Sequence, residues 1–311
     1  MTHHPCYSTF IFLAIILALC PTLSCSRYRD DLDYSYDVVQ TWDVEHLQYG
    51  QIVQFESVFW EPDDTASLRK LIVDDAICTG RDVLEIGTGT GLIAVFCAQH
   101  NASKVIATEI NPAAVANAQY NAAMLAEGLD VEVRAVEKDD PSAFSVIKPG
   151  EKFDLIISNP PWEDGQVSKP AEHAFYDPGF KLMDSLLDGL PKHLQLGGRC
   201  LLAYGHKPAV VRLEAEANRR GYQFKILDDR KLEDLEDDFL PGMLVEIRMP
   251  LNSNTPVAKV QRDDSPSTGT SNAGGSDKGK TSNSRIDQKT EPSVSNSTRP
   301  NQDSEEVEPS K

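Results

Sequence analysis

The stretch of the chain that decides its fold is Val83-Leu84-Glu85-Ile86-Gly87-Thr88-Gly89-Thr90-Gly91. Its first residues are mostly apolar, and its last five place glycine at every second position. An apolar run that suits a helix follows over residues 92–99. Glycine is needed where a backbone turns tightly and approaches a ligand without a β-carbon in the way. The stretch therefore predicts a strand, a ligand-binding loop and a helix, in that order.

Short apolar runs alternate with amphipathic stretches beyond this loop, which is typical of a parallel sheet covered by helices. The expected strands are residues 82–86, 104–109, 131–136, 153–158, 199–204, 222–227 and 243–249. The last two have no helical period between them, which indicates an antiparallel last strand. We therefore expect an α/β, Rossmann-like fold with a seven-stranded, mostly parallel sheet and helices on both faces.

Composition divides the 311 residues into three parts. Residues 1–26 contain an almost unbroken apolar run, which we interpret as a signal or membrane-anchor segment. Residues 27–250 carry the alternating pattern and form the predicted domain. Residues 251–311 are rich in Ser, Asn, Thr and Pro and contain no aromatic residue, which predicts a disordered polar tail.

The location of the domain is predicted from the charges beside the apolar run. Arg27 and Arg29 follow it and no Lys or Arg precedes it, so the positive-inside tendency favours a membrane-associated protein whose domain faces the cytoplasm. The sequence Thr-Leu-Ser-Cys, which follows the run and ends at Cys25, resembles a lipoprotein cleavage site. A secreted form or a lipoprotein therefore stays open as an alternative.

The charge of the chain limits its partners. The net charge is -18, and the predicted tail, with eight Lys and Arg against nine Asp and Glu, contributes almost none of it. A strongly acidic domain repels a phosphate backbone, so we expect a protein or small-molecule substrate rather than a nucleic acid. Cys78, Cys97 and Cys200 are widely spaced among apolar neighbours, which indicates buried thiols rather than a metal site. We expect the protein to be a monomer.

Two interpretations of the glycine loop compete. Gly89-x-Gly91-x-x-Ala94, with Glu109 twenty residues after Gly89, matches the fingerprint of NAD-binding folds. However, Glu85 lies within the strand just before the first glycine, and the G-x-G-x-G pattern begins at Gly87. These two details resemble class I S-adenosylmethionine-dependent methyltransferases. S-adenosylmethionine is therefore the cofactor we expect, with NAD as the alternative.

This resemblance implies roles for particular residues. The acid near the loop, Glu85, would help to hold the methionine end of the cofactor, and Glu109 would bind the ribose hydroxyls. An acid after the third strand, Asp139 or Asp140, would lie near the adenine amino group, unless both belong to a solvated turn. The full set of candidate cofactor-binding residues is Glu85, Gly87, Thr88, Gly89, Gly91, Glu109, Asn111, Asp139, Asp140 and Asn159.

The fourth expected strand ends in Ser158-Asn159-Pro160-Pro161-Trp162. Two prolines cannot continue a strand ladder, so they fix a bend at the edge where open α/β sheets bind ligands. The Asn159 side-chain oxygen and the Pro160 carbonyl can both accept hydrogen bonds from one NH2 group, and the Trp162 ring can pack on its plane. Such acceptors stabilise the positive charge that develops on a planar nitrogen as it takes up a methyl group. We therefore predict Asn159, Pro160 and Trp162 as catalytic residues.

Together the two motifs make the chain similar to the small-methyltransferase group over residues 59–249. This group includes the glutamine methyltransferases of peptide release factors and several N-methyltransferases of adenine and guanine. Residues 58–65 are similar to the segment that borders the cofactor in the glutamine enzymes. Those enzymes carry a helical substrate-binding domain further upstream, whereas this chain has only residues 21–57 between its apolar run and that segment. The resemblance therefore does not single out a release factor as the substrate.

The predicted activity is N-methylation of a planar amide or ring nitrogen, of a protein or a small molecule. The alternative enzymatic activity is methylation of a nucleic-acid base. The alternative that is not an enzyme is a cofactor-binding module without catalytic activity. His173, Phe175, Tyr176 and Asp177 follow the Asn-Pro-Pro-Trp motif, where we expect a lid over the substrate.

Overall fold

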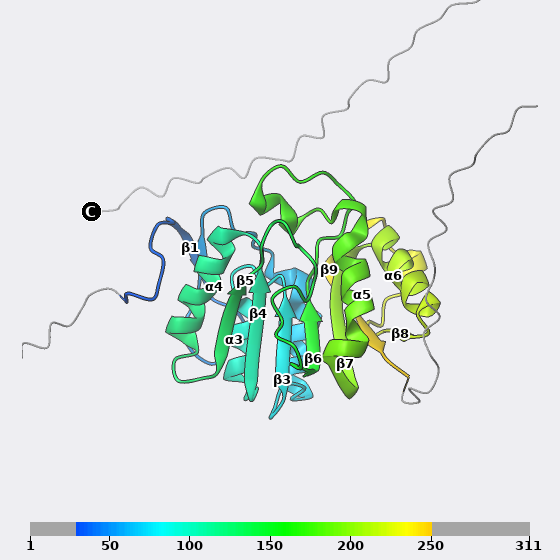
Figure 1. Cartoon of the computed structure of the whole chain (residues 1–311), viewed down its shortest axis with the longest axis horizontal. Helices are drawn as coiled ribbons and strands as arrows, with labels where there is room; N and C mark the ends of the chain where they lie inside the picture. The colour runs from blue at the N-terminus through cyan, green and yellow to red at the C-terminus, as the bar shows by residue number, and fades with distance from the viewer. Residues whose placement is uncertain (1–28, 251–311) are drawn as a thin grey trace, which may run out of the picture. The chain divides into compact units, whose positions relative to one another are not determined.

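The computed structural model describes residues 29–250, which contain one α/β domain (Figure 1). The predicted apolar segment 1–26 and the predicted tail 251–311 lie outside the described residues.

The central sheet has the strand order β5-β4-β3-β6-β7-β9-β8 (Figure 1). The strand bounds are β3 Asp82–Ile86, β4 Lys104–Glu109, β5 Val131–Ala135, β6 Phe153–Ser158, β7 Leu194–His206, β8 Gln223–Ile226 and β9 Asp238–Arg248. All neighbouring pairs from β5 to β7 are parallel, and β9 is antiparallel to both β7 and β8. The predicted seven-stranded sheet with an antiparallel last strand is confirmed.

Helices cover both faces of the sheet because successive strand side chains point to opposite faces. On β3, Val83 packs in a cluster with α2, α3 and the end of α4, whereas Leu84 packs in a cluster with α5 and α6. The helix bounds are α2 Ala66–Asp74, α3 Leu92–Gln99, α4 Pro112–Leu125, α5 Lys181–His193 and α6 Lys207–Arg219. The short 3-10 turns are η1 Pro62–Thr65, η2 Pro170–Ala174, η3 Pro178–Phe180 and η4 Leu232–Asp234.

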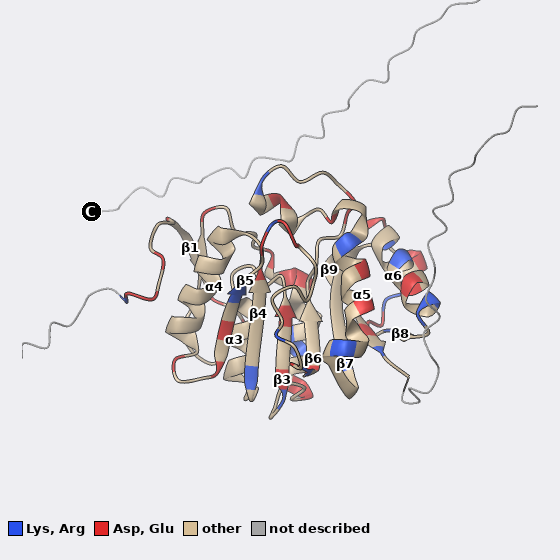
Figure 2. Cartoon of the chain, in the orientation of Figure 1, with Lys and Arg blue, Asp and Glu red and all other residues tan. Residues whose placement is uncertain are grey.

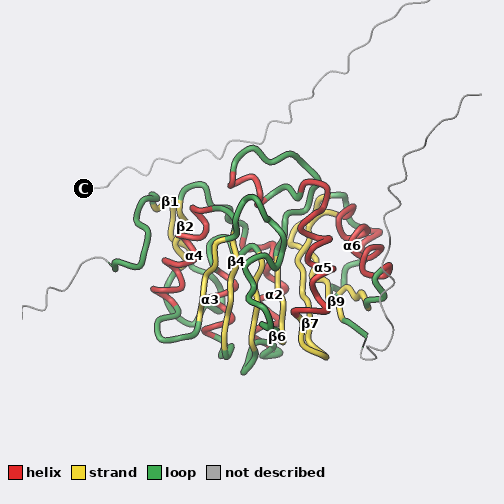
Figure 3. Tube along the Cα trace, in the orientation of Figure 1, coloured by secondary structure: helices red, strands yellow, loops and turns green. Residues whose placement is uncertain are grey.

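A separate two-stranded hairpin, which the sequence pattern did not predict, precedes the sheet and lies beside α4 (Figure 3). Its strands are β1 Val38–Trp42 and β2 Ile52–Phe55. The buried amides of Asn117 and Asn121 on α4 hold it. Their oxygens accept the backbone N–H groups of Phe55 and Val53 at 2.9 and 3.0 Å, and both amide nitrogens donate to the Val53 carbonyl. The hairpin thus depends on residues more than sixty positions away.

The predicted membrane association is not borne out by the residues that the structure describes. Within residues 29–250 no helix is long and apolar enough to cross a membrane. The longest helix there, α4, has 14 residues, whereas a membrane-spanning helix needs about 20. The apolar run on which the prediction relied lies outside the described residues.

Candidate active site

The two sequence motifs meet at the carboxyl edge of the sheet. The chain order of the strands reverses between β3 and β6, which are parallel neighbours. Open α/β sheets bind ligands at such a switch point. The hydroxyl of Ser158, at the end of β6, donates to the carbonyl of Ile86, at the end of β3, over 2.6 Å. The glycine loop after β3 and the Asn-Pro-Pro-Trp bend after β6 therefore start from two joined strand ends.

The three glycines of the loop serve two purposes. Gly87, Gly89 and Gly91 all have positive φ, at 72°, 56° and 83°, a conformation that glycine adopts without steric cost. A β-carbon on Gly87 or Gly89 would meet nothing within 4 Å, whereas one on Gly91 would lie 3.0 Å from the Cα of Ala118 in α4. Gly87 and Gly89 thus leave open space beside the loop, and Gly91 allows α3 and α4 to pack closely.

Glu109, at the end of β4, ties the loop to the next strand. Its carboxylate accepts the backbone N–H groups of Gly89, Ile110 and Asn111 at 2.9, 2.8 and 2.9 Å. The side chain is buried, and this burial raises the pKa of Glu109 despite the three donors. One of its oxygens accepts only the bond from Gly89, so an acceptor direction remains for a ligand hydroxyl.

Glu85 lies beneath the loop and supports it from inside the fold. It is 4% exposed and accepts a hydrogen bond from the Thr88 hydroxyl at 2.6 Å. Burial raises the pKa of Glu85 to about 8, against the opposing effect of hydrogen bonds from Thr88 and the backbone of Ala94. The structure therefore places both Glu85 and Thr88 in the support of the loop.

Three further candidate cofactor residues follow β4 and β5. Asn111 caps α4, where its side-chain oxygen accepts from the N–H of Ala113 at 3.2 Å and its amide nitrogen donates to the carbonyl of Ser57 at 2.8 Å. The side chain of Asn111 is thus engaged by the fold. Asp139 and Asp140 are exposed in the turn region after β5.

Asn159 is joined to a residue that the sequence analysis did not select. Its amide nitrogen donates to the carboxylate of Asp64, on η1, at 3.2 Å. Asp64 is 3% exposed, and burial raises its pKa to about 6. The amide oxygen of Asn159 is buried, and no group among residues 29–250 donates to it. An acceptor without a donor is therefore held beside the glycine loop.

Pro160 and Trp162 complete the bend after β6. Pro160 is buried, and Trp162 is half-buried. The indole N–H of Trp162 donates to the carbonyl of Ala203 on β7 at 3.2 Å. Its ring lies so close to Gly205 that a β-carbon there would be 2.4 Å from the ring carbon Cη2. The ring is thus anchored on β7.

The segment expected to form a lid has mixed roles. Phe175 is half exposed, and its ring meets that of Phe59 edge-on at 5.4 Å. Asp177 is buried, and its carboxylate accepts the backbone N–H groups of Leu182 and Met183 at the start of α5. Burial lowers the pKa of His173. Phe175 therefore packs against Phe59, whereas Asp177 binds the start of α5.

Acidic residues surround this edge of the sheet (Figure 2). The loops that follow β5 and β6 and the turn η1 carry the exposed carboxylates Asp63, Asp139, Asp140, Glu163 and Asp164. Because η1 and these loops border the proposed site, a phosphate backbone would meet repulsion on its approach.

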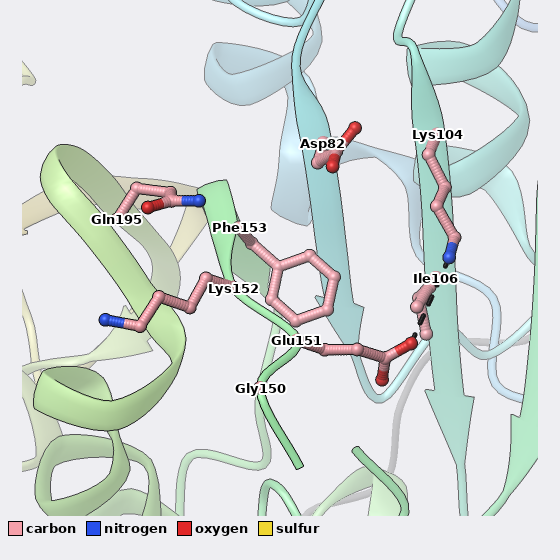
Figure 4. A pocket seen from close by; sticks show the side chains of 8 residues that line it. All are labelled: Asp82, Lys104, Ile106, Gly150, Glu151, Lys152, Phe153 and Gln195. Atoms are coloured by element: carbon pink, nitrogen blue, oxygen red, sulfur yellow. Dashed lines mark ion pairs between the residues drawn. The ribbon is translucent and has the colours of Figure 1, made fainter. Parts of the chain in front are cut away.

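An open pocket lies at the opposite edge, where β3, β4, β6 and β7 begin (Figure 4). The side chains of Asp82, Lys104, Lys152 and Gln195 line it, and Lys104 forms an ion pair with Glu151 at 4.0 Å. Ligands of open α/β sheets bind at the carboxyl ends of the strands, whereas this pocket lies at their amino ends. It is therefore distinct from the proposed site.

Comparison with known proteins identifies relatives of the region that holds the site. The methyltransferase small domain family matches residues 62–207. A protein of Methanocaldococcus jannaschii named as a protein N5-glutamine methyltransferase is 36% identical over 146 residues, which are 45% of this chain and 68% of that protein. A release factor glutamine methyltransferase of Cereibacter sphaeroides is 36% identical over 135 residues, which are 40% of this chain and 46% of that enzyme.

A third relative acts on a different kind of substrate. A tRNA1(Val) (adenine(37)-N6)-methyltransferase of a Flavobacteriaceae bacterium is 37% identical over 94 residues, which are 30% of this chain and 38% of that enzyme. The chain spans about half the length of the release factor relatives that it matches.

Proposed function

Because the chain belongs to the methyltransferase small domain family, whose methyl donor is S-adenosylmethionine, we propose that it methylates the side-chain amide nitrogen of glutamine in a protein. The observation that carries the proposal is the buried amide oxygen of Asn159, which accepts from no group among residues 29–250 and lies beside the glycine loop. A primary amide supplies the N–H donor that this oxygen lacks.

The loop after the neighbouring strand β3, together with Glu109, offers a binding site for the cofactor. The open side of Gly87 and Gly89 lets a ligand approach the loop backbone. The free acceptor direction of Glu109 suits a ribose hydroxyl, and a charged acceptor makes such a bond stronger than a neutral one. When bound, S-adenosylmethionine supplies a methyl group that its sulfonium has already activated.

The residues after β6 would then prepare the acceptor nitrogen. The Asn159 oxygen and the Pro160 carbonyl accept the two N–H bonds of the amide, which orients its nitrogen and stabilises the positive charge that develops there. These acceptors would hold the amide nitrogen in place while it takes up the methyl group, and the nitrogen would then release one proton to water. Correct alignment of the two partners accounts for much of the acceleration of such a transfer.

Methylation of the N6 amino group of adenine is the second candidate, because it presents the same NH2 geometry and one relative is named for it. The net charge of -18 and the exposed carboxylates around the site disfavour an RNA substrate.

Labelling of a cell lysate decides between these candidates. Purified protein is incubated with lysate and S-adenosylmethionine that carries a radioactive methyl group, and the product is treated with protease or with nuclease. We expect the label to be lost to protease only, and mass spectrometry to find it on a glutamine side chain. Label that is lost to nuclease would contradict the proposal in favour of the base methyltransferase.

A further inference from the structure

The carboxylate of Asp64 is an unusual feature of the site, because it is buried without a cation. It lies on η1, 95 residues before Asn159, and among residues 29–250 it forms no ion pair. One of its oxygens accepts the Asn159 amide, and the other is buried with no hydrogen-bond partner in the same part of the chain. A buried ionisable group with such an environment marks a candidate for function.

The fold holds Asp64 rigidly in this place. A β-carbon on Gly242, in β9, would lie 2.5 Å from the carbonyl oxygen of Asp64, so the two backbones are in close contact. On the other side, the guanidinium of Arg69 donates to the Pro62 carbonyl at 2.6 Å and to the Thr65 hydroxyl at 2.8 Å. These bonds brace η1 at both of its ends.

The chemistry of the pair decides which way the amide of Asn159 faces. An ionised carboxylate can only accept hydrogen bonds, whereas an amide donates from nitrogen and accepts at oxygen. The NH2 group of Asn159 must therefore face Asp64, and its oxygen must face away. A charged acceptor on the NH2 group also polarises the amide, which makes its oxygen a stronger acceptor.

We propose that Asp64 is a positioning residue for methyl transfer, which turns the Asn159 amide so that its oxygen meets the N–H group of the substrate. This inference rests on the proposed function. It differs from a purely structural role, because the ionised form of Asp64 is required rather than its packing alone.

The ionisation of Asp64 should therefore appear in the activity. Burial raises its pKa to about 6, and the nearby carboxylates of Glu61 and Asp63 raise it further. When the carboxyl group of Asp64 takes up a proton, it can donate a hydrogen bond as well as accept one. The Asn159 amide is then free to rotate so that its nitrogen and oxygen exchange places. The turnover number should fall as pH falls through about 6.

Other charged groups on the surrounding elements already have partners. On α2, Arg69 binds the backbone of η1, and beside β9, Arg230 pairs with Asp228. At the end of β7, His206 contacts Asp238 at 2.6 Å. The variant Asp64→Asn therefore tests the carboxylate itself, and Asp63→Asn, an exposed carboxylate on the same turn, is its matched control.

The first measurement is independent of activity. In the full chain with 15N-labelled asparagine, the side-chain NH2 signal of Asn159, identified by its loss in Asn159→Asp, should shift with a midpoint near pH 6. The shift should disappear in Asp64→Asn and persist in Asp63→Asn, where the loss of a neighbouring negative charge lowers the midpoint slightly. An Asn159 signal that does not respond to pH in the wild type would overturn the proposal, whether or not Asp64→Asn folds.

The second measurement uses a library of synthetic glutamine-containing peptides with labelled S-adenosylmethionine. We expect Asp64→Asn to lower the turnover number about tenfold to a hundredfold. The fall of the turnover number near pH 6 should disappear in this variant, and its binding of S-adenosylhomocysteine should be unchanged. If the wild type transfers no methyl group although the Asn159 signal titrates, the proposed function fails and the pair is only structural. If Asp64→Asn is as active as the wild type, the positioning role alone is wrong.

Discussion

Asn159 and Glu109 lie on different strands and serve different ligands in the proposed site. Asn159 follows β6 and presents an amide oxygen that has no donor among the described residues. Glu109 ends β4 and accepts three backbone N–H groups of the loops beside it. Substitution of Asn159 should therefore affect the turnover number, and substitution of Glu109 should affect the affinity for the cofactor.

Replacement of Asn159 by Ala should reduce methyl transfer while cofactor binding remains. The variant loses one fixed acceptor for the charge that develops on the substrate, and the loss of such a contact typically lowers the turnover number about a hundredfold or more. Calorimetry with S-adenosylhomocysteine and a labelled-methyl assay measure the two effects separately. A variant that no longer binds the cofactor would place Asn159 in the cofactor site instead.

Replacement of Glu109 should act on the cofactor. Glu109→Ala removes the acceptor for three backbone donors and for the ribose, so S-adenosylhomocysteine should bind about 1 to 3 kcal/mol more weakly. Glu109→Gln keeps the shape but loses the charge and should be the milder change. Titration calorimetry of both variants checks this order, and an unchanged affinity in Glu109→Ala would remove Glu109 from the binding site.

At this scale the sequence revealed the residues within each motif but not the contacts between motifs. Asn159 and Glu109 could be selected because Asn159 follows a recognisable strand and Glu109 ends one. Asp64 could not be selected, although residues 58–65 were expected to border the cofactor. Its partner is 95 residues away, and no local pattern shows that β9 presses η1 against the end of β6.

At the scale of elements, the packing of α3 against α4 depends on Gly91. Gly91→Ala should destabilise the fold by more than Gly80→Ala, although both glycines have positive φ. At Gly80 an added β-carbon meets nothing within 4 Å, so the cost is the backbone strain alone, about 1 to 2 kcal/mol. At Gly91 it also meets the backbone of Ala118 at 3.0 Å. Urea denaturation of both variants gives the difference between their free energies of unfolding. Equal losses of stability would show that the backbone near Ala118 moves away from the added β-carbon at no cost.

The periodic elements were predictable and the hairpin was not. All seven strands of the sheet follow apolar runs, although β7 and β9 begin five residues earlier than their patterns indicate. Four of the five residues of β1 are exposed, so β1 carries no alternation that a pattern can detect. The hairpin is held by Asn117 and Asn121, whose polar side chains would otherwise suggest an exposed helix face.

At the scale of the whole molecule, buried carboxyl groups at the site and ion pairs away from it respond to pH in opposite ways. Arg134 lowers the pKa of Glu151 to about 2, so this pair stabilises the fold at neutral pH and is lost as pH falls from about 4.5 towards 2. Burial raises the pKa of Glu85 to about 8 and that of Asp64 to about 6. Relative to the unfolded chain, folding therefore favours the protonated form of both groups, although Asp64 is still mostly ionised at neutral pH.

The last prediction follows from Glu85. A carboxyl group whose pKa is raised by folding contributes stability that is complete below its unfolded pKa, near 4.5, and is lost as pH rises through its folded value. The free energy of unfolding of the wild type should therefore fall between pH 6.5 and pH 8, by at most about 1.4 kcal/mol per pH unit for this one proton.

The variant Glu85→Gln separates this effect from other titrations. Glutamine cannot ionise, yet its side-chain oxygen can still accept from Thr88 and from the backbone of Ala94, the two groups that bind Glu85. Urea denaturation at pH 6.5 and pH 8 should show a smaller loss of stability in Glu85→Gln than in the wild type. Glu137→Gln, which changes an exposed carboxylate, should behave as the wild type does. If all three proteins lose the same stability over this range, the carboxyl group of Glu85 is ionised in the folded protein at pH 6.5. The glycine loop would then be supported by a buried carboxylate.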